Sequence, residues 1–285
     1  MAKVLPLNPR LFIYRKMNHQ KVVDQIVNWL NDYATKAKVN GFVVGVSGGI
    51  DSALTSTLCA MTGKETLLLE MPIYQAESQV SRAQEHMKWL EEQYSNVRSH
   101  RVELTDVFDQ FMENVPVIEE ENLLHLSLAN TRSRLRMTTL YYFAGIHRLL
   151  VAGTGNKVED FGVGFYTKYG DGGVDVSPIA DLMKTEVYAL CAHLGVAQSI
   201  QVAKPTDGLW GDERSDEDQI GASYPELEWA MNYIDSLPTK TPDLNDTNLS
   251  ERQKEVLAIY WRMNRANQHK MLPIPVCEVV RELGS

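Results

Sequence analysis

Residues 41–62 constrain the fold of this chain more than any other segment. Gly41–Ser47 (GFVVGVS) is a short β-branched run, which is typical of a buried strand, and glycines follow it in the loop Gly45–Ser52 (GVSGGIDS). Residues 51–62 then have the pattern of a helix that ends at Gly63. A strand that turns through glycines into a helix predicts one unit of a parallel α/β sheet.

Further apolar runs alternate with helical segments along the rest of the chain. The expected strands are 67–71, 97–104 and 149–153, and the expected helices are 18–38, 78–93, 126–148, 184–194 and 250–268. The run LLVAG at 149–153 has no polar face, which suits a strand that is buried on both sides. The pattern predicts a Rossmann-like, doubly wound parallel sheet with flanking helices. No linker divides the chain, so we expect residues 1–285 to form a single domain.

The overall charge excludes some classes of partner. A formal net charge of −9 argues against general attraction to nucleic acid or to a membrane surface. No window approaches a membrane span, and the N-terminus lacks the apolar run of a signal peptide, which predicts a cytoplasmic protein. The three cysteines form no CxxC pair and are expected to be small buried apolar groups.

The loop Gly45–Ser52 has the features of a phosphate-binding site. Its glycines allow close approach to an anion, and the following helix presents free N–H groups to it. A Walker A loop would carry a lysine after its last glycine, whereas this chain has Asp51. A carboxylate beside phosphates implies an intervening Mg²⁺. The alternative is a glycine-rich turn without a ligand. The residues expected to bind are Gly45, Val46, Ser47, Gly48, Gly49, Ile50, Asp51 and Ser52.

A second glycine-rich stretch, 153–181, follows the predicted strand 149–153. The carboxyl ends of parallel strands share one edge of a sheet, so this stretch is expected to face the phosphate loop. Glu159 then becomes a second candidate metal ligand beside Asp51, and Lys168 and Lys184 supply cations for a phosphate or carboxylate.

The SGGIDS loop resembles that of the N-type ATP pyrophosphatases, which split ATP between its α- and β-phosphates. The stretch 153–181 (GTGNKVEDFGVGFYTKYGDGGVDVSPIAD) is similar to the signature of ammonia-dependent NAD synthetases, and the resemblance covers nearly the whole chain. It implies an adenine nucleotide alpha hydrolase-like fold. It also implies a ligase that uses ATP, Mg²⁺ and ammonia to amidate deamido-NAD through an adenylylated carboxylate. Because only 44 residues precede Gly45, we expect ammonia rather than glutamine as the donor.

The resemblance also implies roles for individual residues. Asp51 and Glu159 would bind the metal. Thr154, Lys184 and Thr206 would contact ATP together with the loop, and the residues implied for deamido-NAD are Arg134, Lys168, Asp175, His269 and Lys270. Helical geometry puts Arg132 and Arg136 near one face and Arg134 on another.

Several features extend or limit this interpretation. The resemblance implies a homodimer with a shared substrate site, and apolar residues on more than one face of helix 126–148 favour burial in a core or an interface. The acidic, glycine-punctuated segment 207–222 is expected to be a mobile lid, or otherwise a disordered loop. Ile50 occupies a position where ammonia-dependent bacterial members often have Gln. The open alternatives are a GMP synthetase-like or tRNA-modifying pyrophosphatase, and a non-catalytic nucleotide-binding sensor.

Overall fold

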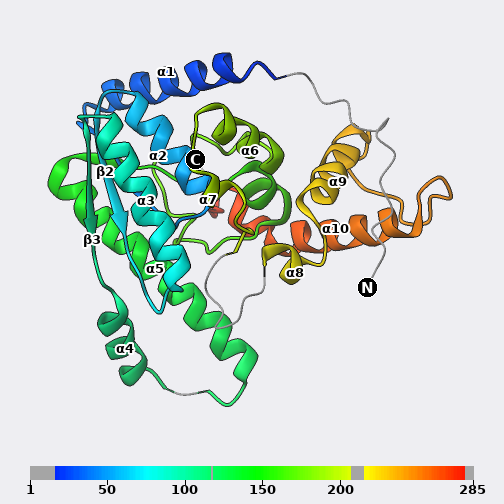
Figure 1. Ribbon diagram of the computed structural model, residues 1–285. Helices are drawn as coiled ribbons and strands as arrows, with labels where there is room; N and C mark the ends of the chain where they lie inside the picture. The colour runs from blue at the N-terminus through cyan, green and yellow to red at the C-terminus, as the bar shows by residue number, and fades with distance from the viewer. Residues whose placement is uncertain (1–16, 117, 207–214, 280–285) are drawn as a thin grey trace, which may run out of the picture.

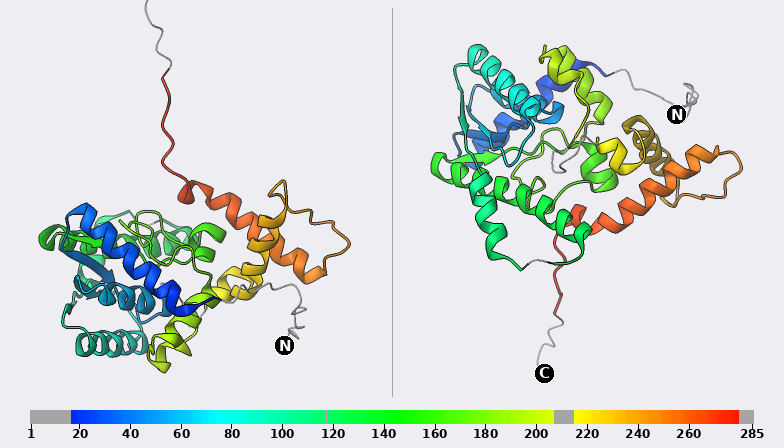
Figure 2. Two further views of the ribbon diagram at one scale, coloured as in Figure 1. Left: turned by 90° about the horizontal axis from the view of Figure 1, so that it is seen from above. Right: turned by 60° about the horizontal axis from the view of Figure 1, so that its bottom comes forward.

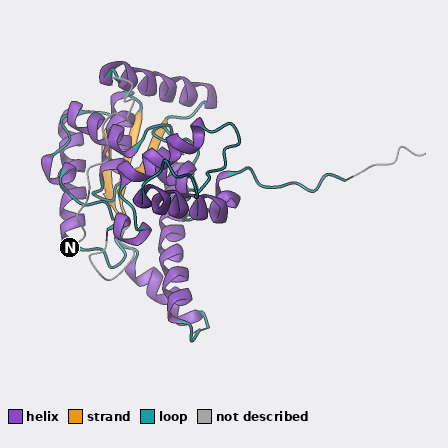
Figure 3. Cartoon of the chain, turned by 90° about the vertical axis from the view of Figure 1, so that its right-hand side faces the viewer, coloured by secondary structure: helices purple, strands orange, loops and turns teal. Residues whose placement is uncertain are grey.

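The computed structural model describes residues 17–116, 118–206 and 215–279. Its strands are β1 (Gly41–Gly45), β2 (Glu65–Glu70), β3 (Val97–Arg101) and β4 (Leu149–Val151), which form one four-stranded parallel sheet in the order β3-β2-β1-β4. Figure 3 shows this sheet between layers of helices. The predicted doubly wound parallel sheet is therefore confirmed.

Helices connect the four strands, and the helices after β4 follow one another in the described part of the chain without a further strand (Figure 1). Their bounds are α1 His19–Ala37, α2 Ile50–Met61, α3 Glu77–Gln93, α4 Thr105–Asn114, α5 Glu121–His147, the π-helix η2 Val158–Val163, α6 Lys184–His193, α7 Gln198–Gln201, α8 Asp216–Ile220, α9 Tyr224–Ser236 and α10 Glu251–Met271. The sequence pattern predicts neither α4 nor α9. Within the expected lid, residues 216–220 form α8, and residues 207–214 lie outside the described residues.

Both faces of the sheet are buried, because successive side chains of a strand point to opposite faces. On β1, Val44 belongs to a core formed with α1, α2, α3 and α6, while Val43 packs in a second core with α4 and α5. Burial on both faces explains why β1 is a continuous apolar run.

The order of the strands creates a crevice at one point of the sheet. From β1 the chain moves outward to β2 and β3, and then returns through α4 and α5 to place β4 on the other side of β1. Connections therefore leave β1 and β4 in opposite directions, and ligands of doubly wound sheets bind at such a switch point.

A smaller helical layer stands beside the sheet. Helices α9 and α10 pack with η2 around a separate core that contains Val158, Leu227 and Tyr260. Figure 2 shows α9 and α10 to one side of the sheet layers, with residues 272–279 running outward from the end of α10. Among the described helices, none has the length and apolar character that crossing a membrane requires.

His86 gives the fold a predictable dependence on pH. This α3 residue is fully buried, its Nε2 lies 2.9 Å from Ser56 Oγ, and burial lowers its pKa to about 4. The unfolded chain binds a proton at His86 as the pH falls through the ordinary pKa of about 6.5, whereas the folded chain does not. We predict that this residue removes about 3 kcal/mol of stability between pH 7 and pH 4.

Chemical denaturation across this pH range measures the effect. The His86→Gln variant should lose less stability on acidification than the parent protein, and His193→Gln, at an exposed position, serves as the control. Equal pH slopes for the parent and His86→Gln would contradict the prediction.

Candidate active site

The phosphate loop between β1 and α2 is held by its own side chains. Ser47 Oγ accepts a hydrogen bond from the Gly49 N–H at 3.2 Å. Ser52 Oγ accepts one from the Ser47 N–H at 3.3 Å and donates to the Gly49 carbonyl at 2.9 Å. Gly48 has a φ of +79°, a conformation that favours glycine. The loop therefore places the start of α2, with its free N–H groups, at the end of the sheet.

The ammonium of Lys184 joins the two candidate metal ligands. Lys184 Nζ lies 2.6 Å from Asp51 Oδ2 and 2.9 Å from Glu159 Oε1. The Lys184 side chain is only 3% exposed, and those of Asp51 and Glu159 are 17% and 16% exposed. The three residues come from α6, α2 and η2, so the two glycine-rich stretches meet at the switch point between β1 and β4.

Two buried residues complete this network. Asn156 Nδ2 donates to Asp51 Oδ1 at 3.1 Å, and its Oδ1 accepts the backbone N–H groups of Val158 and Glu159. Tyr224 donates its hydroxyl to Glu159 Oε1 at 2.5 Å, and the same hydroxyl lies 3.3 Å from Asp216 Oδ2. The sequence interpretation missed both residues. Asn156 follows the glycines of a motif already identified, whereas Tyr224 has no local signal that links it to Glu159.

The pKa values follow from burial and from the shared ammonium. Burial opposes a charge on Lys184, but Asp51 and Glu159 outweigh it and raise the Lys184 pKa. Burial also opposes a charge on Glu159, yet Lys184 and the Tyr224 hydroxyl hold its pKa below the ordinary value. For neighbouring Asp160, burial and then the charge of Glu159 raise the pKa to about 8. For Asp51, burial outweighs the attraction of Lys184 and raises the pKa. Lys184 is therefore charged, and its charge holds Glu159 in the ionised form while opposing the effect of burial on Asp51.

Asp51, Glu159, Asp160 and Lys184 line a cavity of about 710 Å³. Proteins bind small molecules and cofactors in cavities of about this size. The phosphate loop, Asp51, Glu159, Lys184, Thr154 and Thr206 all face it, and so do Arg134, Lys168, His269 and Lys270. Asp175 is the one residue of the predicted set that does not line this cavity.

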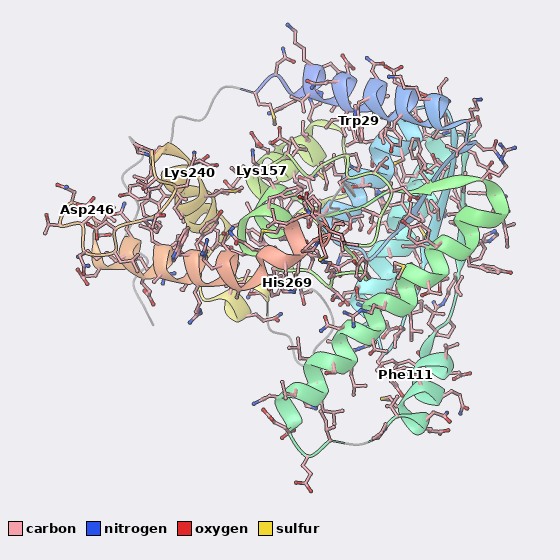
Figure 4. The ribbon with its side chains drawn as sticks, turned by 180° about the vertical axis from the view of Figure 1, so that it is seen from behind. Trp29, Phe111, Lys157, Lys240, Asp246 and His269 are labelled. Atoms are coloured by element: carbon pink, nitrogen blue, oxygen red, sulfur yellow. The ribbon has the colours of Figure 1, made fainter. Side chains whose placement is uncertain are left out.

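A second wall of the cavity carries cations that donate to backbone carbonyls. Arg134 donates to the Lys168 carbonyl, Lys168 donates to that of His269 at 2.5 Å, and Lys270 donates to those of Gly164 and Tyr166 at 2.8 Å. Figure 4 labels His269 near the end of α10. Within the described residues these cations have carbonyl rather than carboxylate partners, so their charge is available to an anionic ligand.

Arg134 differs from its helical neighbours as the α5 geometry predicts. Arg136 donates to the Met71 carbonyl and to Gln75 Oε1, both at 2.9 Å, and Arg132 lies over the ring of Phe108. Arg134 instead lies against the Lys168 carbonyl. The three arginine side chains therefore contact different parts of the protein.

Asp175 has a structural environment of its own. It is exposed, and its carboxylate accepts the Tyr141 hydroxyl at 3.0 Å and the Val151 N–H at 2.9 Å. These contacts turn it toward α5, away from the cavity.

The carboxylate pair fits the chemistry of Mg²⁺. Among the described residues, no group of three or more His, Cys, Asp or Glu side chains could hold a metal on its own. Mg²⁺ commonly uses one or two carboxylates together with substrate phosphates rather than a site built wholly from protein. Asp51 and Glu159 are suited to a cation that arrives with a nucleotide.

Comparison with known proteins identifies the family. The model of the NAD synthase family matches residues 22–273. The chain belongs to this family. It is 37% identical over 267 residues to the NH(3)-dependent NAD(+) synthetase of Methanosarcina acetivorans, an alignment that covers 92% of this chain and 100% of the relative.

Solved structures show the same fold as this NAD synthase family member. An NMN synthetase from Francisella tularensis superposes with a TM-score of 0.77 and 26% identity, covering 93% of this chain and 100% of that chain. An NH3-dependent NAD synthetase from Campylobacter jejuni, in complex with nitrate, superposes with a TM-score of 0.72 and 25% identity, covering 92% and 100%. The fold and family inferred from the sequence are confirmed.

The bridging role of Lys184 predicts a large effect on stability. Replacing Lys184 with Met leaves two buried carboxylates without their cation, so we predict that Lys184→Met destabilises the ligand-free protein by about 3–5 kcal/mol. Urea denaturation at neutral pH provides the measurement.

Lys157→Met is the matched control, because Lys157 pairs at 2.8 Å with Asp181, whose side chain is 96% exposed (Figure 4 labels Lys157). This surface pair should contribute less than about 1 kcal/mol. Similar losses of stability in the two variants would show that the buried Lys184 bridge stabilises the fold no more than a surface ion pair does.

Proposed function

We propose that this chain is an ATP-dependent ligase that amidates the nicotinate carboxylate of deamido-NAD with ammonia, giving NAD, AMP and pyrophosphate. The observation that carries the proposal is the group of Asp51, Glu159 and Lys184 beside a phosphate loop without a Walker lysine. Family membership and the NH(3)-dependent relatives support the same reaction. They do not support the GMP synthetase-like, tRNA-modifying or sensor alternatives.

The phosphate-loop wall of the cavity would bind ATP. Loop amides, Thr154 and Thr206 would hold the phosphates, and Asp51 and Glu159 would bind Mg²⁺. When bound, Mg²⁺ supplies positive charge to the phosphate oxygens. Lys184 would orient the α-phosphate, so that the nicotinate carboxylate can attack it while pyrophosphate leaves. Positioning and charge neutralisation would thus provide most of the rate enhancement.

The second wall of the cavity would bind deamido-NAD. Arg134, Lys168, His269 and Lys270 face the same space as the loop, and their charges suit a carboxylate and the phosphates of a dinucleotide. A carboxylate bound there meets the α-phosphate of ATP, and ammonia then attacks the adenylylated carbonyl, releasing AMP. Exclusion of water from the cavity would protect this adenylate.

Asp175 suggests a substrate site shared between two chains. It contacts Tyr141 on α5, and α5 exposes Leu123, Leu126, Tyr142 and Ile146. A helix with this much exposed apolar surface is suited to an interface. We therefore propose a homodimer in which Asp175 contacts deamido-NAD near the interface. Each chain would act as a single domain spanning 1–285 in the cytoplasm.

The reaction assay combines purified protein with ATP, Mg²⁺, ammonium and deamido-NAD, and quantifies NAD, AMP and pyrophosphate. ADP as the main nucleotide product would overturn the proposal. Glutamine in place of ammonium should support little turnover. Nicotinate mononucleotide is tested in parallel, because one structural neighbour is named an NMN synthetase. A higher kcat/KM for the mononucleotide would reassign the acid substrate.

Variants of the metal ligands test the site in the same assay. Asp51→Asn and Glu159→Gln should each lower turnover about a hundredfold or more, as expected for loss of a preorganised electrostatic contact. Asp181→Asn, a change at an exposed carboxylate, is the control and should retain activity. Near-native turnover of either variant at both low and saturating Mg²⁺ would remove that residue from the site.

The dimer is tested by mass in solution. The chain has a mass of 32.2 kDa, and sedimentation equilibrium at micromolar concentration should give twice this value. Tyr142→Glu combined with Ile146→Glu should produce monomers, because two charges would enter the proposed interface, and should weaken deamido-NAD binding. A fully active monomer of the parent chain would contradict the prediction.

A further inference from the structure

Helix α3 touches the phosphate loop at Gly48. A Cβ atom on Gly48 would lie 2.5 Å from the Gln79 carbonyl oxygen and 3.1 Å from the Ala83 nitrogen. The loop backbone therefore rests directly on the turn of α3 that carries Arg82. Gly48 allows this approach both by having no side chain and by its φ of +79°.

Arg82 is anchored to the loop through one nitrogen. Its Nε donates to the Gly48 carbonyl at 3.2 Å, and its half-buried side chain lines the cavity beside Gly48 and Gly49. In the described part of the chain, the two terminal guanidinium nitrogens of Arg82 have neither a carboxylate nor a hydrogen-bond partner. The anchor fixes the plane of the guanidinium and leaves two nitrogens to donate to a ligand.

Lys184 and Arg136, two other cations around the cavity, already have partners of their own. Lys184 is shared between Asp51 and Glu159, and Arg136 is committed to the Met71 carbonyl and to Gln75. The cations that donate to carbonyls, such as Lys168 and Lys270, contact His269 and residues 164–166 rather than the phosphate loop. Pyrophosphate gains negative charge as it leaves ATP, and the loop itself carries Asp51 where a Walker loop would carry its lysine.

We propose that Arg82 binds the β- and γ-phosphates of ATP and stabilises the departing pyrophosphate. This inference rests on the proposed function, because it assigns Arg82 to the nucleotide of that reaction. A planar guanidinium suits the task, since it donates two parallel hydrogen bonds to phosphate oxygens. Arg82 supplies from α3 the positive charge that the loop sequence lacks.

The experiment measures ligand binding separately from turnover. Isothermal titration of inorganic pyrophosphate, with Mg²⁺ present, compares the parent protein with Arg82→Gln and Arg82→Lys. Arg82→Gln should weaken pyrophosphate binding about tenfold or more. Arg82→Lys should weaken it less, because lysine keeps the positive charge but lacks the planar guanidinium that donates two parallel hydrogen bonds. Lys88→Gln, at an exposed α3 residue, is the matched control and should bind like the parent protein.

AMP separates phosphate binding from a structural role. It lacks the β- and γ-phosphates, so Arg82→Gln should keep AMP affinity within about twofold if the loop is intact. An equal loss of AMP and pyrophosphate affinity, or unchanged pyrophosphate affinity, would overturn the proposal. In the synthetase assay, Arg82→Gln should lower kcat/KM for ATP about tenfold or more and leave the KM for ammonia unchanged.

The binding measurements also keep this inference separate from the proposed reaction. If the parent protein forms no NAD but Arg82→Gln still loses pyrophosphate affinity selectively, the reaction assignment fails and the role of Arg82 stands. If the parent protein forms NAD and Arg82→Gln binds pyrophosphate normally, the role of Arg82 fails and the reaction stands.

Discussion

The ammonium of Lys184 is the contact on which the arrangement of the site depends. It is buried between carboxylates from two other segments, at 2.6 Å from Asp51 and 2.9 Å from Glu159. Removing such ions from water costs several kcal/mol for each ion, and the attraction repays this cost only when the geometry and the remaining hydrogen bonds are good. Asn156 and Tyr224 supply those hydrogen bonds. The site therefore forms only when the sheet edge, η2 and α9 are all in place.

The cavity that this contact lines has two walls with different electrostatic character. Beside the phosphate loop, Asp51 and Glu159 share the charge of Lys184, and among the described residues Arg82 has no carboxylate partner. On the second wall, the partners of Lys168 and Lys270 within the described residues are carbonyl oxygens. An anion is favoured on the second wall directly, whereas beside Asp51 and Glu159 the proposed function supplies a divalent cation to offset the two carboxylates. A chain with a net charge of −9 can thus concentrate anionic substrates in one cavity.

The parts of the fold that the sequence predicts are those encoded by local patterns. The strand residues Val43 and Val44 are both apolar because both faces of the sheet are covered, and the glycines after β1 identify the phosphate loop. The alternation of strands and helices then predicts that Asp51 and Glu159 lie at one edge of the sheet. It does not predict the contacts that they make there. Family resemblance adds the residues of the opposite wall, which have no distinctive local spacing.

The parts that the sequence does not predict depend on tertiary contacts. Helix α4 carries Val107, Phe108, Phe111 and Met112 at helical spacing, but it has only ten residues and Phe108 is its one fully buried side chain, so its place is decided by packing against the rest of the fold. Helix α9 does begin with a capping box at Ser223 and Glu226, but the acidic, glycine-rich residues before it suggest a continuing loop. Tyr224 meets Glu159 across 65 residues of sequence, and Asp175 turns to α5 rather than to the cavity. No periodicity within a segment encodes such contacts between segments.

In the proposed function, the bridge would let the buried Lys184 act both in the folded protein and toward the nucleotide. Lys184 can leave the two carboxylates only if another cation compensates them and another anion accepts its own charge, because the surrounding burial makes an unpaired ion costly. A nucleotide that arrives with a divalent cation brings both partners at once, whereas either partner alone leaves one buried charge uncompensated. In the proposed reaction, the strong contact that stabilises the folded site would therefore favour the complete complex of metal and nucleotide over its separate components.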